Sequence, residues 1–202
     1  MIYRRIIKRV IDIIMAIIGI IVTSPLVVLT SILIANKIGR PILFKQVRSG
    51  KNGKPFLMYK FRSMTNDCDK NGNLLPDEAR MTKFGLKLRK YSIDELPQFI
   101  NILKGDMSII GPRPLPKEYD EHYDEFQRRR LDVKPGIVGL ASINGRNQQS
   151  WDSKFTCDIE YVDNCSFALD LKIFFRAIIV TLKHESVESE GFVAGEPFIK
   201  KS

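Results

Sequence analysis

Two adjacent carboxylates, Asp94 and Glu95, are the side chains best suited to do chemistry in this sequence. They lie in residues 88–98, which read LRKYSIDELPQ. Ser92 followed three residues later by Glu95 is a capping-box pattern, although Pro97 would shift the true cap to Asp94. Either way the pair is predicted to lie in the first turn of a helix, where free backbone donors and the helix dipole favour ionised carboxylates and attract phosphate oxygens. Taken alone, such a pair is more often just a favourable first turn.

Basic side chains elsewhere in the chain strengthen the case for a site. The candidates for phosphate binding are Lys60, Arg62, Arg89, Arg113 and Arg146. Arginine forks match the geometry of phosphate groups. Arg113 is flanked by two prolines, which restrict the backbone and reduce the entropy lost when its guanidinium binds. An arginine taken singly is more often part of a solvated surface, but together these residues predict a site for a phosphorylated substrate.

Four motifs make the sequence resemble the bacterial sugar transferase family, the monotopic phosphoglycosyl transferases. They are KFRSM at 60–64, LRKYSIDELPQ at 88–98, KGDMSIIGPRP at 104–114 and KPGIVG at 134–139. The motifs follow the family's order, and the similarity covers nearly the whole chain. Within the family the chain most resembles the PglC-type transferases of diacetylbacillosamine phosphate, which open a protein N-glycosylation pathway.

The resemblance implies a reaction and a role for each carboxylate. Asp94 would attack the β-phosphorus of a UDP-sugar, UMP would leave, and undecaprenyl phosphate would take the sugar phosphate from Asp94. An aspartate with an ordinary pKa of about 3.9 is ionised at neutral pH and needs no base to activate it. Glu95 would serve as base, metal ligand or orienting group. Mg²⁺ is the expected cofactor, held against Asp94, because hard oxygen ligands and a diphosphate suit it.

The N-terminal segment predicts a membrane location. Residues 13–35 carry no charge, and an uncharged run of this length can cross a bilayer as a helix. Basic residues flank this run on both sides, and positive charge marks the cytoplasmic side. We therefore expect a re-entrant helix in residues 1–40, broken at Ser24 and Pro25. The family resemblance implies a catalytic domain in 41–202 on the cytoplasmic face of the bacterial inner membrane. The alternative is a single spanning helix with a proline kink. Asp12 is expected to pair with Lys8 or Arg9 near the headgroups.

The remaining periodicity predicts an α/β domain that is mostly helical with a small β-hairpin. The hairpin joins 42–47 to 56–61, and helices are expected at 81–89, 117–131, 153–162 and 170–182. The last helix is either core or an amphipathic helix lying on lipid. The family resemblance implies a compact domain docked on the membrane by such amphipathic helices.

Composition leaves two rival function classes to weigh. A net charge of +9 attracts anions of any kind, so a membrane-tethered basic module for nucleic acid or anionic lipid is the alternative. No nucleic acid partner is expected, because basic and aromatic residues do not interleave as in known motifs. A phosphoaspartate phosphatase or kinase lacks its D-x-D-x-T motif or Walker loop here. Three widely spaced cysteines support neither a disulfide framework nor structural zinc.

One further motif fits a calcium loop. Residues 67–78 match the EF-hand template D-x-[DN]-x-[DN]-G-x5-E. The flanks do not show a helix pair, Pro76 falls late in the loop, and no partner hand exists. A polar turn is therefore the favoured interpretation.

Overall fold

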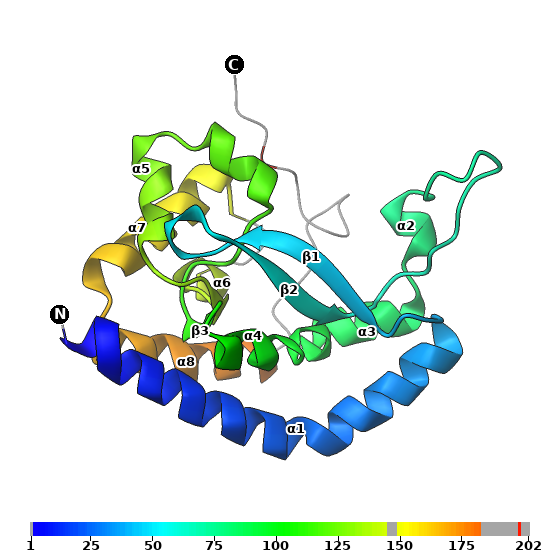
Figure 1. The fold of residues 1–202 in the computed structure, drawn as a ribbon, viewed down its shortest axis with the longest axis horizontal. Coiled ribbons are helices and arrows are strands. Elements are labelled where there is room, and N and C mark those ends of the chain that lie inside the picture. Colours follow the sequence, from blue (N-terminus) through cyan, green and yellow to red (C-terminus); the bar gives the residue numbers. More distant parts are fainter. Residues whose placement is uncertain (1, 145–148, 183–197, 199–202) are drawn as a thin grey trace.

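The computed structural model describes residues 2–144, 149–182 and 198, and helical segments dominate it (Figure 1). The helices are η1 (Tyr3–Ile7), α1 (Lys8–Lys37), η2 (Lys51–Gly53), α2 (Asp77–Arg80), α3 (Lys83–Lys90), η3 (Ile93–Glu95), α4 (Gln98–Lys104), η4 (Lys117–His122), α5 (Glu125–Arg128), η5 (Arg129–Asp132), α6 (Leu140–Ile143), α7 (Trp151–Asn164) and α8 (Phe167–Leu182). The strands are β1 (Leu43–Ser49), β2 (Pro55–Phe61), β3 (Ser108–Ile110) and β4 (Gly136–Val138).

The strands form two small sheets. Strands β1 and β2 make the predicted antiparallel hairpin, in register from Leu43 opposite Phe61 to Ser49 opposite Pro55. Strands β3 and β4 pair in parallel, a contact that the sequence did not predict. The prediction of a mostly helical domain with a small β-hairpin is therefore confirmed, with a second short sheet added.

Helix α1 runs without interruption through Pro25 and bends near its middle, at the lower edge of Figure 1. Pro25 has no N–H to donate to the carbonyl of Ile21, four residues earlier. The Ser24 hydroxyl donates to that carbonyl instead, at 2.8 Å. Thr23 donates likewise to Gly19, at 2.7 Å. The predicted break at Ser24 and Pro25 is thus a bend in a helix whose carbonyls stay satisfied.

Both ends of α1 pack against the same domain. Near its start, Ala16 is fully buried with Met58 and Ile102. Near its end, Ile34 is fully buried with Phe61. By length and composition Tyr3–Lys37 is long and apolar enough to cross a membrane. Only 11% of its apolar window is buried inside the protein. The helix therefore offers a long exposed apolar face while its two ends are tied to one body.

The prediction for Asp12 is wrong. Its Oδ1 accepts hydrogen bonds from the Ser108 hydroxyl and the Ile109 N–H, both at 2.9 Å, and Asp12 is 3% exposed. Lys8 pairs instead with Asp170 of α8 at 2.6 Å, and Arg9 donates to backbone carbonyls at the end of α4. Asp12 therefore fixes α1 to β3, because donors of β3 satisfy it better than a headgroup-side pair.

The single helix predicted for 117–131 is also wrong in extent. The segment divides into η4, α5 and η5, because Tyr123 is extended and Asp124 starts a new helix with a capping box to Gln127. Tyr123 and Arg130 are buried, but Phe126 is exposed. The expected face therefore splits between the core and solvent.

The other predicted helices are present with shifted ends. Helix α3 starts at Lys83 because Thr82 caps it, accepting from the Gly85 N–H at 2.8 Å. Helix α7 extends the segment predicted for 153–162 by two residues at each end, and its apolar stripe is buried.

Helix α8, which the sequence assigned either to the core or to a lipid surface, packs one apolar face into the core. Ile173 and Val180 are buried in the core, whereas Phe175, Ile178 and Ile179 are exposed. A core face and an exposed apolar face therefore share one helix.

Asn101 fixes α4 against the hairpin. Its Oδ1 accepts from the Tyr59 N–H at 3.0 Å, and its amide donates to the Leu57 carbonyl at 2.8 Å and to Asp106 at 3.2 Å. The side chain thus replaces a neighbouring strand along the free edge of β2, and α4 is positioned relative to Lys60.

We expect Asn101→Leu to lower the free energy of unfolding by about 1–3 kcal/mol, because it leaves the partly buried Tyr59 N–H and Leu57 carbonyl without their partner. Thermal unfolding in detergent micelles measures the change. Asn164→Leu is the control, since its exposed amide bonds only one carbonyl of its own helix. Equal shifts in the two variants would contradict this role for Asn101.

Candidate active site

The carboxylate pair lies on η3, a single 3₁₀ turn between α3 and α4. Ile93 and Leu96 pack beneath the turn against Phe61 and the buried Leu88. This packing leaves the acidic side chains on the opposite side, where Asp94 is still only 6% exposed. The turn therefore holds a nearly buried carboxylate by apolar contacts on its other face.

The predicted capping box at Ser92 is wrong. Ser92 adopts the left-handed conformation, with φ of 55°, and its N–H bonds the Arg89 carbonyl to close α3. A residue in that conformation ends a helix, whereas an N-cap requires an extended backbone. Helix α4 begins only at Gln98, after Pro97. The carboxylates therefore precede α4, and the dipole of that helix is not what stabilises their charge.

Two cations from separate elements stabilise the pair instead. Lys60 of β2 places its Nζ 2.7 Å from Glu95 Oε1 and 3.8 Å from Asp94 Oδ2. Arg113, in the loop after β3, places Nη2 3.0 Å from the same Glu95 oxygen. The Lys60 side chain is 16% exposed and that of Arg113 54%, so Arg113 forms the open side of the site.

The other predicted basic residues divide between the site and its surroundings. Arg89 donates from Nε to the Ser63 hydroxyl at 3.0 Å, and its charge acts on Asp94. Arg62 is directed to the segment before β1, donating to the Arg40 carbonyl at 2.9 Å. Arg146 lies outside the described residues. The structure thus gathers Lys60, Arg89 and Arg113 at the carboxylates, whereas the Arg62 guanidinium bonds the segment before β1.

The pKa values of the two neighbouring carboxylates are shifted in opposite directions. Burial raises the pKa of Asp94, and the charge of Glu95 adds to this, while Lys60 and Arg89 oppose it. Burial would also raise the pKa of Glu95, but Lys60 and Arg113 outweigh it and lower that pKa to about 2. Glu95 is therefore a fixed anion, and Asp94 is the carboxylate whose charge is held less tightly.

The loop carrying Arg113 is held by two arginines that sequence reasoning did not assign to the site. Arg130 donates from Nη2 to the Arg113 carbonyl at 2.6 Å, and is itself fixed by Asp158 at 2.8 and 3.0 Å. Arg48 donates to the Pro114 carbonyl at 3.3 Å. Burial and the charge of Arg113 lower the pKa of Arg48 to about 10. These bonds position the loop rather than touch the carboxylates.

A sequence signal for Arg130 did exist. It falls on the face of 117–131 that also carries Tyr119 and Tyr123. An arginine on an apolar face must be buried with a partner, because an unpaired buried charge is costly. Its partner Asp158 sits on the stripe of α7, between Phe155 and Ile159.

A divalent ion fits this site only together with a phosphorylated substrate. Over residues 2–144, 149–182 and 198, no group of three or more His, Cys, Asp or Glu side chains could hold a metal. Mg²⁺ is commonly held by one or two carboxylates plus substrate phosphates. Glu95 Oε1 already accepts from two cations, so Asp94 is the carboxylate better placed to share such an ion.

The stretch that matched a calcium loop uses its acidic groups within a turn. Asp69 Oδ1 accepts the backbone N–H groups of Asn71 and Asn73, at 2.8 and 2.9 Å. Asp67 Oδ2 accepts the Thr65 hydroxyl at 2.6 Å. These bonds agree with the favoured interpretation of a polar turn.

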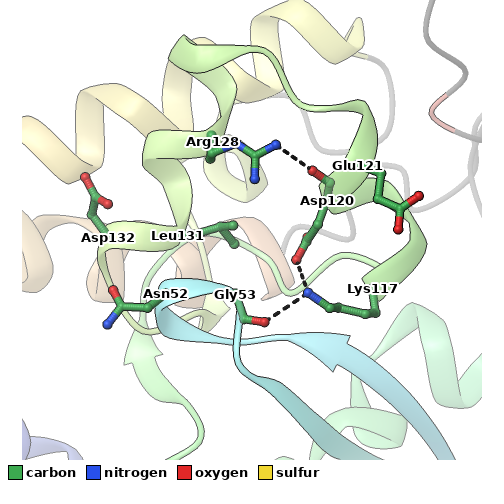
Figure 2. A pocket seen from close by; sticks show the side chains of 8 residues that line it. All are labelled: Asn52, Gly53, Lys117, Asp120, Glu121, Arg128, Leu131 and Asp132. Atoms are coloured by element: carbon green, nitrogen blue, oxygen red, sulfur yellow. Dashed lines mark hydrogen bonds and ion pairs between the residues drawn. The ribbon is translucent and has the colours of Figure 1, made fainter.

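A cavity of about 490 Å³ at the far end of the hairpin is lined by none of the predicted site residues that the structure describes (Figure 2). Lys117 crosses it, donating to Asp120 at 2.8 Å and to the Gly53 carbonyl at 3.0 Å, and Arg128 donates to the Asp120 carbonyl at 3.1 Å (Figure 2). Ser49 also donates to Asp120, at 2.7 Å. These charges bind one another and join the hairpin turn to η4 and α5.

Known proteins similar to this chain are sugar transferases. The family model for bacterial sugar transferases matches residues 3–184. The uncharacterized sugar transferase EpsL of Bacillus subtilis (strain 168) is 52% identical over 193 residues, covering 96% of each chain.

Two further relatives carry names that state a reaction. The UDP-N-acetylgalactosamine-undecaprenyl-phosphate N-acetylgalactosaminephosphotransferase of Aeromonas hydrophila is 41% identical over 180 residues, covering 85% of this chain and 43% of the relative. The UDP-glucose:undecaprenyl-phosphate glucose-1-phosphate transferase of Escherichia coli (strain K12) is 39% identical over 186 residues, covering 86% and 40%. This chain thus spans less than half of those two proteins. The match to the family model over most of its length nevertheless makes this chain a member of the bacterial sugar transferase family.

Proposed function

We propose that this protein transfers a sugar-1-phosphate from a UDP-sugar to undecaprenyl phosphate, with release of UMP and a covalent intermediate on Asp94. The observation that carries the proposal is a nearly buried Asp94 beside Glu95, whose charge is fixed by Lys60 and Arg113. The names of the two relatives from Aeromonas hydrophila and Escherichia coli support the donor and acceptor classes.

In the first step an Asp94 carboxylate oxygen attacks the β-phosphorus of the donor. A bond from oxygen to phosphorus forms, the bond from the β-phosphorus to the bridging oxygen breaks, and UMP leaves with that electron pair. Lys60 and Arg113 offer positive charge where the transferring group becomes more negative. The raised pKa of Asp94 means that its anion is less stabilised than an ordinary aspartate, so the sequence argument from an ordinary pKa is corrected.

In the second step an oxygen of the acceptor phosphate attacks the same phosphorus. The bond to Asp94 breaks, and the carboxylate leaves as an anion. The acyl phosphate is activated, so no further energy source is needed.

Glu95 is best suited to orient the cations. A carboxylate with a pKa of about 2 is a weak base at neutral pH, which disfavours a proton-transfer role. Its one oxygen instead holds Lys60 and Arg113 in place.

Mg²⁺ is the cofactor that we propose for this site. Asp94, together with the diphosphate of the donor, would hold it. When bound, the ion would neutralise negative charge that develops on the leaving UMP.

We also propose that α1 enters and leaves the bilayer on one side, so that the domain lies on the cytoplasmic face of the bacterial inner membrane. The burial of both Asp12 and Ile34 in the same domain supports this, because a straight spanning helix would separate its two ends by the bilayer thickness. The exposed apolar residues of α8 support contact with lipid.

The topology can be tested with single-cysteine variants labelled in intact cells and in inverted vesicles. Each variant replaces Cys68, Cys157 and Cys165 by serine and adds one cysteine, at Ile2 or at Lys70. We expect both cysteines to react only in inverted vesicles with a membrane-impermeant thiol reagent. Labelling of Ile2→Cys in intact cells while Lys70→Cys stays protected would establish the spanning alternative.

We expect Asp94→Asn to lower UMP release and lipid-linked product by at least about 1,000-fold, because the amide is a poor nucleophile. The assay combines protein, UDP-sugar, undecaprenyl phosphate and Mg²⁺ and quantifies UMP. A basic binding module would release none even with the wild-type protein. Asp163→Asn, on the surface of α7, is the control and should retain wild-type rates. Substantial turnover by Asp94→Asn would refute the assigned nucleophile.

The raised pKa of Asp94 predicts the pH dependence of the first step. Only the ionised carboxylate attacks, so UMP release should fall as the pH drops through a pKa above the ordinary aspartate range. Removing the positive charge of Lys60 should raise that pKa further and move the acid limb to higher pH. Single-turnover UMP release measured against pH in Lys60→Met gives the shift. In Lys60→Arg the release should fall at the same pH as in wild type. A limb that Lys60→Met leaves in place would count against this electrostatic role.

Diacetylbacillosamine phosphate is the sugar phosphate that we propose, on the basis of the motif resemblance. Screening UDP-sugars for UMP release should give the highest kcat/KM with UDP-diacetylbacillosamine. Higher values with UDP-glucose or UDP-N-acetylgalactosamine would instead place the chain's specificity with the named relatives.

A further inference from the structure

A second cavity of about 900 Å³ opens between the C-terminal half of α1, the start of the hairpin and α4. Its lining residues are Val27, Ser31, Arg40, Pro41, Ile42, Leu43, Phe44, Lys45, Phe61, Arg62, Pro97 and Ile100. Most of these side chains are apolar. Ser31 adds little polarity, because its hydroxyl donates to the Val27 carbonyl of its own helix at 2.7 Å. The cavity is therefore an apolar groove, called here the α1–α4 groove.

The charged residues that line the groove all have one sign. They are Arg40, Lys45 and Arg62, and none of the described residues that line the groove is a carboxylate. Arg62 is held in place by the Arg40 carbonyl. An apolar groove with only positive charges is complementary to a ligand that has a hydrocarbon chain and an anionic head.

The groove adjoins the catalytic carboxylates. Phe44, which lines it, lies directly opposite Lys60 in the hairpin register, so their side chains share one face. Pro97 lines it two residues after Glu95. The Arg62 N–H bonds the Ile42 carbonyl at 2.9 Å, which continues the hairpin pairing past β2 and keeps Arg62 near the site. A phosphate held by Arg62 would thus lie beside the pair.

The other end of the groove meets the apolar surface of the protein. Val28 and Leu29, which neighbour Val27 on α1, are 59% and 54% exposed, and Ile100 of α4 is 46% exposed. A long hydrocarbon chain could leave the groove there without entering water.

We propose that the α1–α4 groove binds the polyprenyl phosphate acceptor, with its first isoprene units between α1 and α4 and its phosphate at Arg62. This inference rests on the proposed transfer reaction. The UDP-sugar donor does not suit the groove, because a nucleotide would leave many polar atoms against apolar side chains. The donor therefore approaches from the Arg113 side, and the two substrates reach Asp94 from different directions.

The test separates the two half-reactions in three proteins: wild type, Val27→Trp and Val22→Trp. Val27 lines the groove, whereas Val22 is 71% exposed on α1 before Pro25 and does not line it, so the pair is matched in residue and change. UMP release in a single turnover without acceptor reports the first step. The KM for undecaprenyl phosphate in detergent micelles reports the acceptor site.

We expect Val27→Trp to raise the acceptor KM by about 10-fold or more, which corresponds to about 1.4 kcal/mol, while the UMP burst stays as in wild type. Val22→Trp should change neither. Arg62→Gln should raise the same KM about 10-fold, and Arg62→Lys should recover most of the loss. An unchanged acceptor KM in Val27→Trp overturns the groove assignment, whereas absence of any UMP burst in wild type would overturn the proposed reaction itself.

A second measurement on the wild-type protein removes dependence on how the variants fold. A farnesyl phosphate carrying a diazirine on its terminal isoprene should label residues 27–31 or 97–100 on irradiation, and undecaprenyl phosphate should suppress the labelling. Labelling elsewhere would overturn the proposal. Equal suppression by phosphatidylglycerol would also overturn it, because it would show that the groove holds bulk lipid.

Discussion

The ion pairs of Glu95 with Lys60 and Arg113 are the contacts on which the rest of the site depends. A single carboxylate oxygen joins a hairpin strand to a proline-flanked loop. Satisfying both cations makes Glu95 a permanent anion, and that anion then opposes ionisation of Asp94 next to it. The two acids are adjacent in sequence, but their different partners give them different tasks.

Local patterns predicted much of this structure. The hairpin and α7 follow from alternation and helical spacing, and the phosphate-matching chemistry of basic side chains pointed to Lys60, Arg89 and Arg113 before any geometry was known. Patterns failed where one residue has competing uses. Serine is a favoured N-cap residue, but Ser92 closes α3 instead. Asp12 has nearby lysine and arginine neighbours, but tertiary donors from β3 satisfy it.

The features that sequence reasoning missed arise from contacts between distant segments. The parallel pairing of β3 with β4 joins two short runs, neither of which has enough alternation to predict a strand. The buried pair of Arg130 with Asp158 joins η5 to α7, and it supports the Arg113 carbonyl from behind. The Arg62 guanidinium bonds the Arg40 carbonyl before β1, which separates its task from that of Lys60.

The burial of α1 at both ends has a consequence for how the protein holds together. Ala16 and Ile34 fill space in the apolar clusters of the domain, and Asp12 supplies the acceptor for two donors of β3. Excising the helix would open voids in these clusters and leave two donors of β3 without an acceptor, and each unsatisfied donor costs about 1–3 kcal/mol. The membrane-facing helix and the catalytic domain therefore fold as one cooperative unit, and a cut between them destabilises the domain as well as detaching it.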